Sequence, residues 1–266
     1  MPVTCQQSLT PLDRESFGRL SYDVYAQILV IRKELGRFFD EKHYKRALSL
    51  RRDDVAIEVP VIVSHKTFQK PYYLDLLLAH GAILEFKAAE ALVARHKAQL
   101  MHYLMLVDLP HGMLINIRPE RVSREFVNNA LTRQERMRFE VINNMLKPKP
   151  PGADVFQQHL CDLLHDWGTC LDLALYEEAL THFFGGDDQV VRPASVVFQG
   201  SELGSQNLRF VTGKTAFKLT AFEKSESQRL FASHAQRLVN HAQVEALLWA
   251  NIARHQITFR SLVPEK

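Results

Sequence analysis

The chain of 266 residues lacks the features that mark several large classes of protein. Its three cysteines, Cys5, Cys161 and Cys170, are too few and too scattered for a disulfide framework or a zinc knuckle. No apolar run approaches the roughly 18 residues that a membrane-spanning helix needs. The N-terminal residues show no basic start followed by an apolar core, so we expect no signal peptide. We therefore expect a cytoplasmic protein with no membrane partner.

Several common catalytic motifs are also missing. The sequence has no Gly-x-x-x-x-Gly-Lys-Ser/Thr phosphate loop, no Gly-x-Ser-x-Gly elbow and no His-Glu-x-x-His zinc motif. Residues 200–204, Gly-Ser-Glu-Leu-Gly, are expected to form a turn between strands rather than a phosphate loop. Any catalytic group therefore has to be sought in another pattern.

The composition is that of a folded protein with an uneven distribution of charge. Apolar residues make up 46% and charged residues 24%, enough for a core and a soluble surface. The net charge is +3, but residues 1–150 hold 23 Lys and Arg against 17 Asp and Glu. This basic excess points weakly to a polyanionic partner, and ordinary solubilising charge explains it about as well.

A proline-rich segment divides the chain. Residues 147–152, Lys-Pro-Lys-Pro-Pro-Gly, cannot continue a helix and favour an extended spacer. The sequence thus predicts a linker at 147–152 between two domains, residues 1–146 and residues 153–266.

The first domain is predicted to be a mixed α/β layer fold. Apolar spacing predicts helices over about 21–35, around 41–48 and over about 88–107. Runs rich in β-branched and apolar residues predict strands over 55–63, 72–78, 82–87 and 112–117, with a tight turn at 79–81. A charged helical tail is expected over about 132–146. The fold class is therefore α/β, a mixed β-sheet flanked by helices.

The order and spacing of motifs in the second domain repeat those of the first. Gly36 with Tyr44-x-x-Ala-Leu is matched by Gly168 with Tyr176-x-x-Ala-Leu, 132 residues later. Strands are expected over 190–198, 207–211, 215–220 and 247–252, with a helix over about 225–246. Equal order and spacing predict a tandem duplication.

Two acidic strands carry the strongest chemical signal. Asp75 interrupts a run of leucines, and Glu85 and Lys87 alternate on the strand that follows the turn, so they share one face. A hairpin brings Asp75 beside Glu85. Paired carboxylates hold a hard divalent ion, and the lysine positions a water or neutralises a phosphate, as phosphodiester hydrolysis requires. On spacing alone, a satisfied ion-pair network is an equally good interpretation.

These residues stand within a longer set of matching motifs over about residues 22–120. The set resembles the GxxExxY proteins, a branch of the PD-(D/E)XK nuclease superfamily, and comprises Leu35-Gly36, Glu41-x-x-Tyr44, Tyr73-Leu-Asp75-Leu-Leu77, Leu84-Glu-Phe-Lys87-Ala88, His96-x-x-Gln99-Leu100 and Gly112-Met-Leu-Ile-Asn116. One departure is visible, because Phe38 stands where the family motif has its first glycine.

The resemblance implies a restriction-endonuclease-like fold and roles for particular residues. By position, Asp75, Glu85 and Glu41 would hold the metal, Mg²⁺ or Mn²⁺. Lys87 would be the catalytic lysine, with Glu41 and Gln99 supporting the site. Without the resemblance, a solvated helix charge is the better interpretation of Glu41. For His96 and Gln99, which face together, a polar helix margin is nearly as good an interpretation as a site-bracing pair.

The second domain has lost this chemistry in sequence. Lys218 and Thr220 stand where the first has Glu85 and Lys87, and no carboxylate pair remains. The other counterparts are Arg209 for Asp75 (with one gap), Leu173 for Glu41 and about His234 for Gln99. We expect a degenerate nuclease-like repeat that either packs as a pseudo-dimer partner, so that a monomer suffices, or binds something else. Its acidic charge balance argues against its being the nucleic-acid surface.

The predicted function is metal-dependent hydrolysis of nucleic acid, DNA or RNA, at one site in the N-terminal repeat. Arginines at 118, 121, 124, 133, 136 and 138 offer contacts to a phosphate backbone, although a solvated helix face explains them somewhat better. The alternative function is a non-catalytic nucleic-acid-binding or protein-assembly module on a nuclease-like fold.

Overall fold

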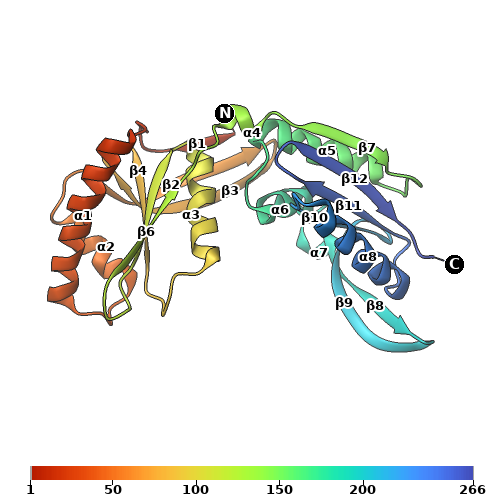
Figure 1. Cartoon of the computed structure of the whole chain (residues 1–266). Coiled ribbons are helices and arrows are strands. Elements are labelled where there is room, and N and C mark those ends of the chain that lie inside the picture. The colour runs from red at the N-terminus through yellow and green to blue at the C-terminus, as the bar shows by residue number, and fades with distance from the viewer. Residues whose placement is uncertain (1, 266) are drawn as a thin grey trace. The chain divides into compact units, whose positions relative to one another are not determined.

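The computed structural model describes residues 2–265 and divides the chain into two compact units, Met1–Arg133 and Gln134–Lys266 (Figure 1). The division falls before the proline-rich segment. Residues 147–152 therefore lie within the second unit, whereas the sequence placed them between two domains.

The first unit is a six-stranded sheet with helices on it. Its elements are β1 (Val3–Cys5), α1 (Arg14–Leu35), α2 (Glu41–Ser49), β2 (Val55–His65), β3 (Phe68–Leu78), β4 (Ala82–Lys87), α3 (Ala94–Val107), β5 (His111–Asn116) and β6 (Ser123–Asn128). The strands lie in the order of their numbers, and every neighbouring pair is antiparallel except β4 and β5, which are parallel. The parallel pair is joined through α3, as a parallel connection requires.

The second unit also contains a six-stranded sheet. Its elements are α4 (Arg133–Arg136), β7 (Glu140–Met145), α5 (Ala153–Trp167), α6 (Leu173–Phe183), α7 (Asp187–Val190), β8 (Val191–Phe198), β9 (Ser201–Thr212), β10 (Thr215–Thr220), α8 (Ser225–His241), β11 (Ala246–Ile252) and β12 (Gln256–Leu262). The strand order is β7-β12-β11-β10-β9-β8. Five consecutive strands, β8 to β12, repeat the order and the directions of β2 to β6, including one parallel pair, β10 and β11.

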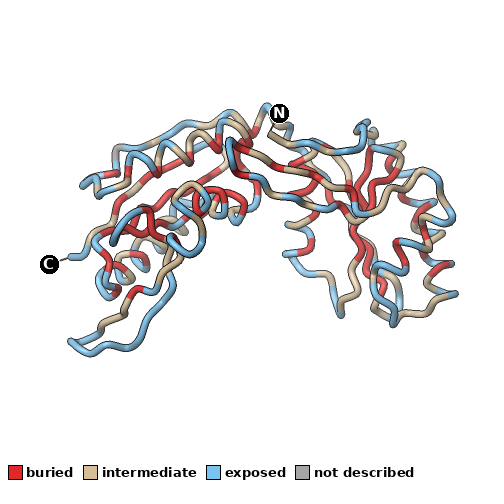
Figure 2. The backbone as a smooth tube through the Cα atoms, turned by 180° about the vertical axis from the view of Figure 1, so that it is seen from behind, coloured by how far each residue is buried: buried red, intermediate tan, exposed pale blue. Residues whose placement is uncertain are grey.

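Each core lies where a sheet meets its helices. Buried residues follow the central strands and the inner faces of the helices in both units (Figure 2). In the first unit, α1 and α2 pack on one sheet face through Val24, Ile28, Ile31 and Leu48 against Leu84 and Phe86. Since strand side chains alternate, Glu85 and Lys87 point to the opposite face. That face is the one that α3 covers, and it carries the polar residues described below.

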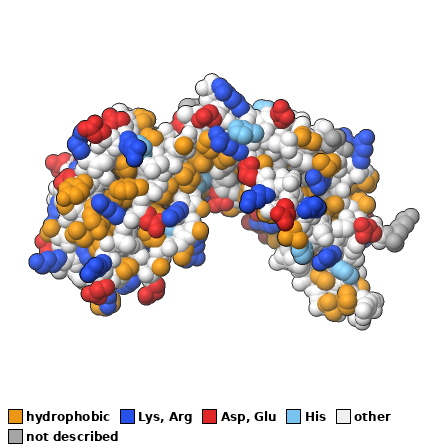
Figure 3. All heavy atoms as spheres, in the orientation of Figure 1, with side chains coloured by type: hydrophobic (Ala, Val, Ile, Leu, Met, Phe, Trp, Pro, Cys, Tyr) orange, Lys and Arg blue, Asp and Glu red, His pale blue; other side chains and the backbone are white. Residues whose placement is uncertain are grey.

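Some large apolar side chains stay at the surface of the first unit. Figure 3 shows hydrophobic side chains on the face of α1 and α2, interspersed with Lys and Arg. The exposed large apolar residues on these two helices and directly beside them in sequence are Tyr22, Leu29, Val30, Phe38, Phe39 and Leu50. Phe38 is 77% exposed, so the residue that departs from the family motif leaves the core undisturbed.

The predicted elements around Asp75 and Glu85 are confirmed. The strand over 82–87 has the predicted bounds, and the turn before it contains Ala79 and His80 with positive φ. The first helix is longer than expected because Asp13, whose side chain accepts from the Ser16 amide, caps it at residue 14. The helix expected from 88 begins only at Ala94, because the Ala88 and Ala89 amides donate to side chains instead.

The helical tail expected over 132–146 is wrong. Only Arg133–Arg136 is helical, and Glu140–Met145 forms strand β7, which pairs in parallel with β12. Strands β1, β6 and β12 were not predicted either. In the described part of the chain, no helix combines the length and apolarity that a membrane crossing demands.

Candidate active site

The site begins where strands β3 and β4 separate. Their ladder pairs Leu78 to Leu76 with Ala82 to Leu84 and stops there. Beyond it, the amide of Phe86 donates to Asp75 Oδ2 at 3.0 Å instead of to a backbone carbonyl of β3. The Asp75 side chain thus sits in the fork between the strands, 15% exposed. This fork, with Glu85 and Lys87 on its other arm, is called the β3/β4 fork below.

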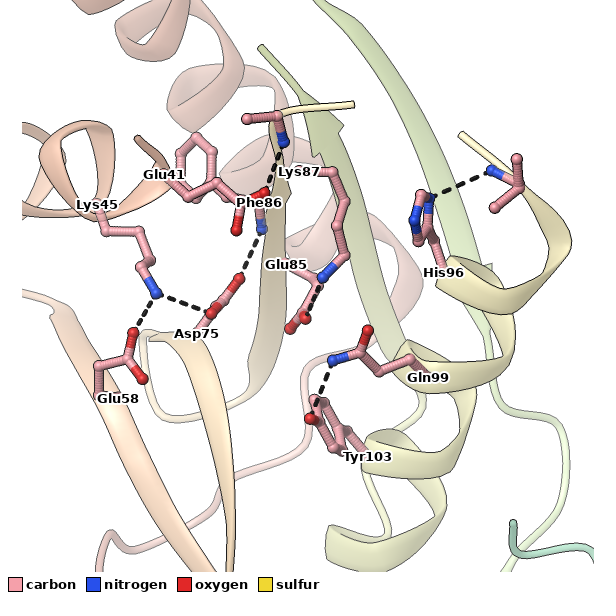
Figure 4. A network of polar contacts seen from close by, with 12 residues as sticks. Glu41, Lys45, Glu58, Asp75, Glu85, Phe86, Lys87, His96, Gln99 and Tyr103 are labelled. Atoms are coloured by element: carbon pink, nitrogen blue, oxygen red, sulfur yellow. Dashed lines mark hydrogen bonds and ion pairs between the residues drawn. The ribbon is translucent and has the colours of Figure 1, made fainter. Parts of the chain in front are cut away.

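Glu85 and Lys87 contact each other on the β4 arm of this fork, on the face that the sequence predicted them to share. Lys87 Nζ donates to Glu85 Oε1 at 2.8 Å, and the side chain of Glu85 is only 2% exposed (Figure 4). The second oxygen, Glu85 Oε2, is buried and has no hydrogen-bond partner among the described residues. A buried carboxylate oxygen without a donor is costly, so this atom is suited to an additional cation.

The electrostatics of Glu85 follow from this burial. Desolvation raises the pKa of Glu85 to about 7, and repulsion from Asp75 and Glu41 adds to it, although Lys87 acts in the opposite direction. Burial lowers the pKa of Lys87, but Glu85, Asp75 and Glu41 outweigh it and raise the pKa overall. Lys87 is therefore a stable ammonium, whereas Glu85 needs a further positive charge to ionise fully.

Glu41 reaches the same place from helix α2. It is the first residue of the helix, and its Oε1 accepts from the amide of Ala88 at 2.6 Å, just beyond Lys87. The solvated helix charge that spacing alone favoured is thus excluded. This contact also fixes the N-terminus of α2 against the end of β4 (Figure 4).

Two further residues of the site escaped the sequence analysis. Lys45 Nζ donates to Asp75 Oδ1 at 2.8 Å and to Glu58 Oε1, and its side chain is only 8% exposed. Burial lowers the pKa of Lys45, but the hydrogen bonds to Asp75 and Glu58 raise it by more. The pKa of Lys45 therefore lies above its ordinary value. A signal was present, because Lys45 follows Glu41 by one helical turn and so shares its face.

Glu58 has an unusual backbone. Its φ is 51° in the middle of β2, between the ladder pairs of Ile57 and Val59 with β3. A non-glycine residue in this region costs about 1–3 kcal/mol, which is typical of positions held for a function. The strain turns the Glu58 carboxylate toward Lys45 at the edge of the fork.

Helix α3 contributes an uncharged wall. Gln99 Nε2 donates to the hydroxyl of Tyr103 at 3.0 Å, and both lie beside Glu85 and Lys87 in Figure 4. Burial raises the pKa of Tyr103 above its ordinary value, so the hydroxyl stays protonated. His96 turns away: its Nδ1 accepts from the amide of Val93 and caps the helix. Gln99 thus pairs with Tyr103 and not, as the sequence had suggested, with His96.

The charges of the fork do not balance. When all four carboxylates are ionised, those of Glu41, Glu58, Asp75 and Glu85 face only two ammonium groups, those of Lys45 and Lys87, which leaves two negative charges. A divalent cation supplies the missing charge, and carboxylate oxygens are the ligands that Mg²⁺ and Mn²⁺ prefer. The chemistry of the residues present is thus compatible with such an ion, which Asp75 and Glu85 Oε2 would hold.

The fork is not a preformed ligand cage. Among residues 2–265, no three His, Cys, Asp or Glu side chains are already grouped as a metal site. The contacts above give the reason, because Lys45 holds one oxygen of Asp75 and Lys87 holds one oxygen of Glu85. A cation would have to replace Lys45 on Asp75.

Comparison with known proteins agrees with this geometry. Residues 18–128 match the family model of the PD-(D/E)XK nuclease superfamily. The match runs from within α1 to the end of β6, and so includes every side chain of the β3/β4 fork. No curated protein and no solved structure matches the chain. Residues 18–128 are thus similar to the PD-(D/E)XK nuclease superfamily, and the mixed α/β fold of the first unit is compatible with the fold of that superfamily.

The second unit has a similar fork with inverted charges. The ladder between β9 and β10 ends at Arg209 and Phe217, so Lys218 and Thr220 lie beyond it. Register places Leu208 opposite Lys218, which corrects the assignment of Arg209 as the counterpart of Asp75 by one residue. On helix α6, Glu177 faces Arg209 at 3.4 Å and Lys218 at 3.7 Å.

Proposed function

We propose that the first unit is a metal-dependent phosphodiesterase of nucleic acid, a nuclease with one active site in the β3/β4 fork. The observation that carries the proposal is the orphaned, buried Glu85 Oε2 beside Asp75 in a fork with two surplus negative charges. The superfamily match over residues 18–128 supports it. The residue motifs favour the GxxExxY branch of that superfamily.

Each residue has a role that follows from its position. Asp75 and Glu85 would hold Mg²⁺ or Mn²⁺, with Glu41 beside them, and the ion would supply charge stabilisation on the phosphate and a lower pKa for water. Lys87, an ammonium fixed by Glu85, donates a hydrogen bond to a phosphate oxygen or orients the attacking water. Gln99 and Tyr103 hold the wall of the fork, and Glu41 holds the end of β4 in place through Ala88.

We also propose that the second unit is a degenerate copy of the first. Tyr44 OH donates to the Gly36 carbonyl and Tyr176 OH to the Gly168 carbonyl, both at 2.6 Å. The Asn116 side chain accepts from the amide of Ala89 and donates to its carbonyl. The Asn251 side chain makes the same two hydrogen bonds with Phe222. Equal strand order and two equal sets of side-chain-to-backbone contacts support a duplication in which only the first copy kept its carboxylates.

The alternative is a binding module without catalysis. The contact that favours it is the Lys45 ammonium, which occupies Asp75 where a metal would bind. In that case, the fork would be a permanent ion-pair network that stabilises the fold.

Cleavage assays separate the two functions. Single- and double-stranded DNA and RNA are incubated with Mg²⁺, Mn²⁺ or EDTA, using the wild type, Asp75→Asn, Lys87→Met and an exposed control, Glu90→Gln. The nuclease proposal requires metal-dependent cleavage, abolished by EDTA and reduced by about 10²-fold or more in the two site variants only. Cleavage that persists when Asp75 and Lys87 are both replaced would reject it.

A further inference from the structure

The second unit contains a cavity of about 280 Å³ at its own fork. It lies where β9 and β10 separate beneath α8, and Arg209, Lys218 and His234 are among the residues that line it. Its volume is near the lower end of the roughly 300–1,000 Å³ of small-molecule sites. The cavity therefore has room for one small ligand, in the place where the first unit has its carboxylates.

The charged groups of this cavity favour an anion. One carboxylate, Glu177, faces two cations, Arg209 and Lys218, at distances longer than good hydrogen bonds. One positive charge is left over. Both cations are partly exposed, at 36% and 51%, and within residues 2–265 the buried Nε of Arg209 has no hydrogen-bond partner. The partly exposed side chains of Arg209 and Lys218 can therefore donate to the oxygens of a phosphate, which Arg binds in a forked geometry.

The rest of the lining favours a flat aromatic body. Phe217, Phe231 and Leu238 supply an apolar wall, and aromatic rings of this kind stack on nucleobases. Gln206 and Asn207 at the same cavity carry amide groups, which both donate and accept as the edges of bases do. A purely apolar ligand would leave the two cations without a partner, and a purely anionic ligand would leave the apolar wall without one.

We infer that the cavity of the second unit binds a nucleotide through one phosphate and one base, either as a free mononucleotide or as the phosphorylated end of a nucleic-acid strand. Arg209 and Lys218 hold the phosphate, and the base lies against Phe231. The site is separate from the β3/β4 fork and needs no metal and no cleavage. It gives the degenerate repeat a binding role of its own.

Calorimetric titration of the full-length protein in EDTA tests this directly. The probes are AMP, GMP, CMP and UMP, adenosine without phosphate, and one short DNA strand with and without a 5′-phosphate. The variants are Arg209→Met and Lys218→Met, which keep the apolar stems, and a matched control, Lys214→Met, at an exposed turn outside the cavity. The fold of each variant is checked by its unfolding midpoint.

The expected result is saturable binding of a mononucleotide or of the 5′-phosphorylated strand, weakened about tenfold or more in each cavity variant and unchanged in Lys214→Met. Preference for mononucleotides over the strand would identify a free nucleotide, and the reverse would identify a strand end. Equal binding of adenosine, equal affinities in all variants, or no saturation by any phosphorylated probe would overturn the inference. The titration is done in EDTA and measures binding, not cleavage. Its result is therefore independent of whether the first unit proves to be a metal-dependent nuclease.

Discussion

Lys45 Nζ lies 2.8 Å from Asp75 Oδ1, so that an ammonium from helix α2 occupies the carboxylate that the sequence assigns to a metal. The same ammonium also holds Glu58 across the fork. Lys45 therefore balances charge in the fork in the absence of a divalent ion. Replacing Lys45 is therefore expected to lower the stability of the metal-free protein while leaving the carboxylates that would bind a metal in place.

Replacement of Lys45 by Met should destabilise the metal-free protein. It leaves Asp75, 15% exposed, and Glu58 without their shared cation, and an uncompensated buried charge costs about 3 kcal/mol. Urea unfolding in EDTA measures this loss. Added Mn²⁺ should restore more stability to the variant than to the wild type, because the ion no longer competes with an ammonium.

Lys42→Met is the matched control, since Lys42 is 72% exposed on the same helix. It should change the unfolding free energy by less than about 0.5 kcal/mol. If Lys45→Met and Lys42→Met are equally stable in EDTA, Lys45 does not balance the fork.

Replacement of Glu85 by Gln should stabilise the metal-free protein while removing its response to metal. Glu85 is 2% exposed with one oxygen unpaired, and a neutral amide avoids the cost of burying that charge. A gain of about 1 kcal/mol is expected by urea unfolding in EDTA, as at other sites where function opposes stability. Mn²⁺ should raise the unfolding midpoint of the exposed control Glu90→Gln but not that of Glu85→Gln. An equal Mn²⁺ shift in both variants contradicts Glu85 as a ligand.

The two tyrosines of the repeated motif should be energetically equivalent. Tyr44 and Tyr176 are each almost fully buried, and each donates to a glycine carbonyl eight residues earlier. Tyr44→Phe and Tyr176→Phe leave those carbonyls without this donor, at a cost of about 1–2 kcal/mol each. Chemical unfolding measures the loss. A cost confined to one of them would speak against the two units as copies.

Acid should weaken the first unit through Asp54. Arg52 donates to both oxygens of Asp54 and also contacts Asp23 of α1, and the hydrogen bonds from Arg52 lower the pKa of Asp54 below 3.8. A lowered folded-state pKa gives stability above the unfolded value, and that stability is lost as pH falls through the folded value. The contribution is roughly 1 kcal/mol because Asp54 is 37% exposed.

Asp54→Asn checks this contribution. The variant should be less stable than the wild type near neutral pH, and the difference should shrink as the pH falls below the ordinary pKa of Asp and through the lowered folded-state pKa of Asp54. Thermal unfolding across this range gives the comparison. A difference that is independent of pH would assign the loss to packing rather than to the carboxylate.

Much of the fork could be predicted from local patterns. The period of two along residues 82–87 placed Glu85 and Lys87 on one face, and the short turn placed Asp75 beside them. Such predictions succeed because the deciding contacts lie within about a dozen residues. The spacing of Lys45 from Glu41 indicated only a shared helix face. The contacts of Lys45 with Asp75 and Glu58 were missed because they depend on how α2 packs on the sheet.

The wrong prediction over residues 132–146 has a similar cause. The charged, helix-like sequence after Arg133 forms strand β7 because β12, more than 100 residues later, provides a partner for it. The intrinsic helix propensity of these residues is small compared with the backbone hydrogen bonds that β7 makes with β12. The difference between Arg209 and Leu208 as the residue opposite Lys218 likewise depends on where the β9–β10 ladder is irregular.

The most direct test of the β3/β4 fork as a metal-dependent active site is the anomalous difference density of a Mn²⁺-soaked crystal of the full-length protein. The account predicts a Mn²⁺ peak within about 2.0–2.4 Å of carboxylate oxygens of Asp75 and Glu85, with Lys45 displaced from Asp75. A well-ordered fork without such a peak at saturating Mn²⁺, with Lys45 still bound to Asp75, would contradict it.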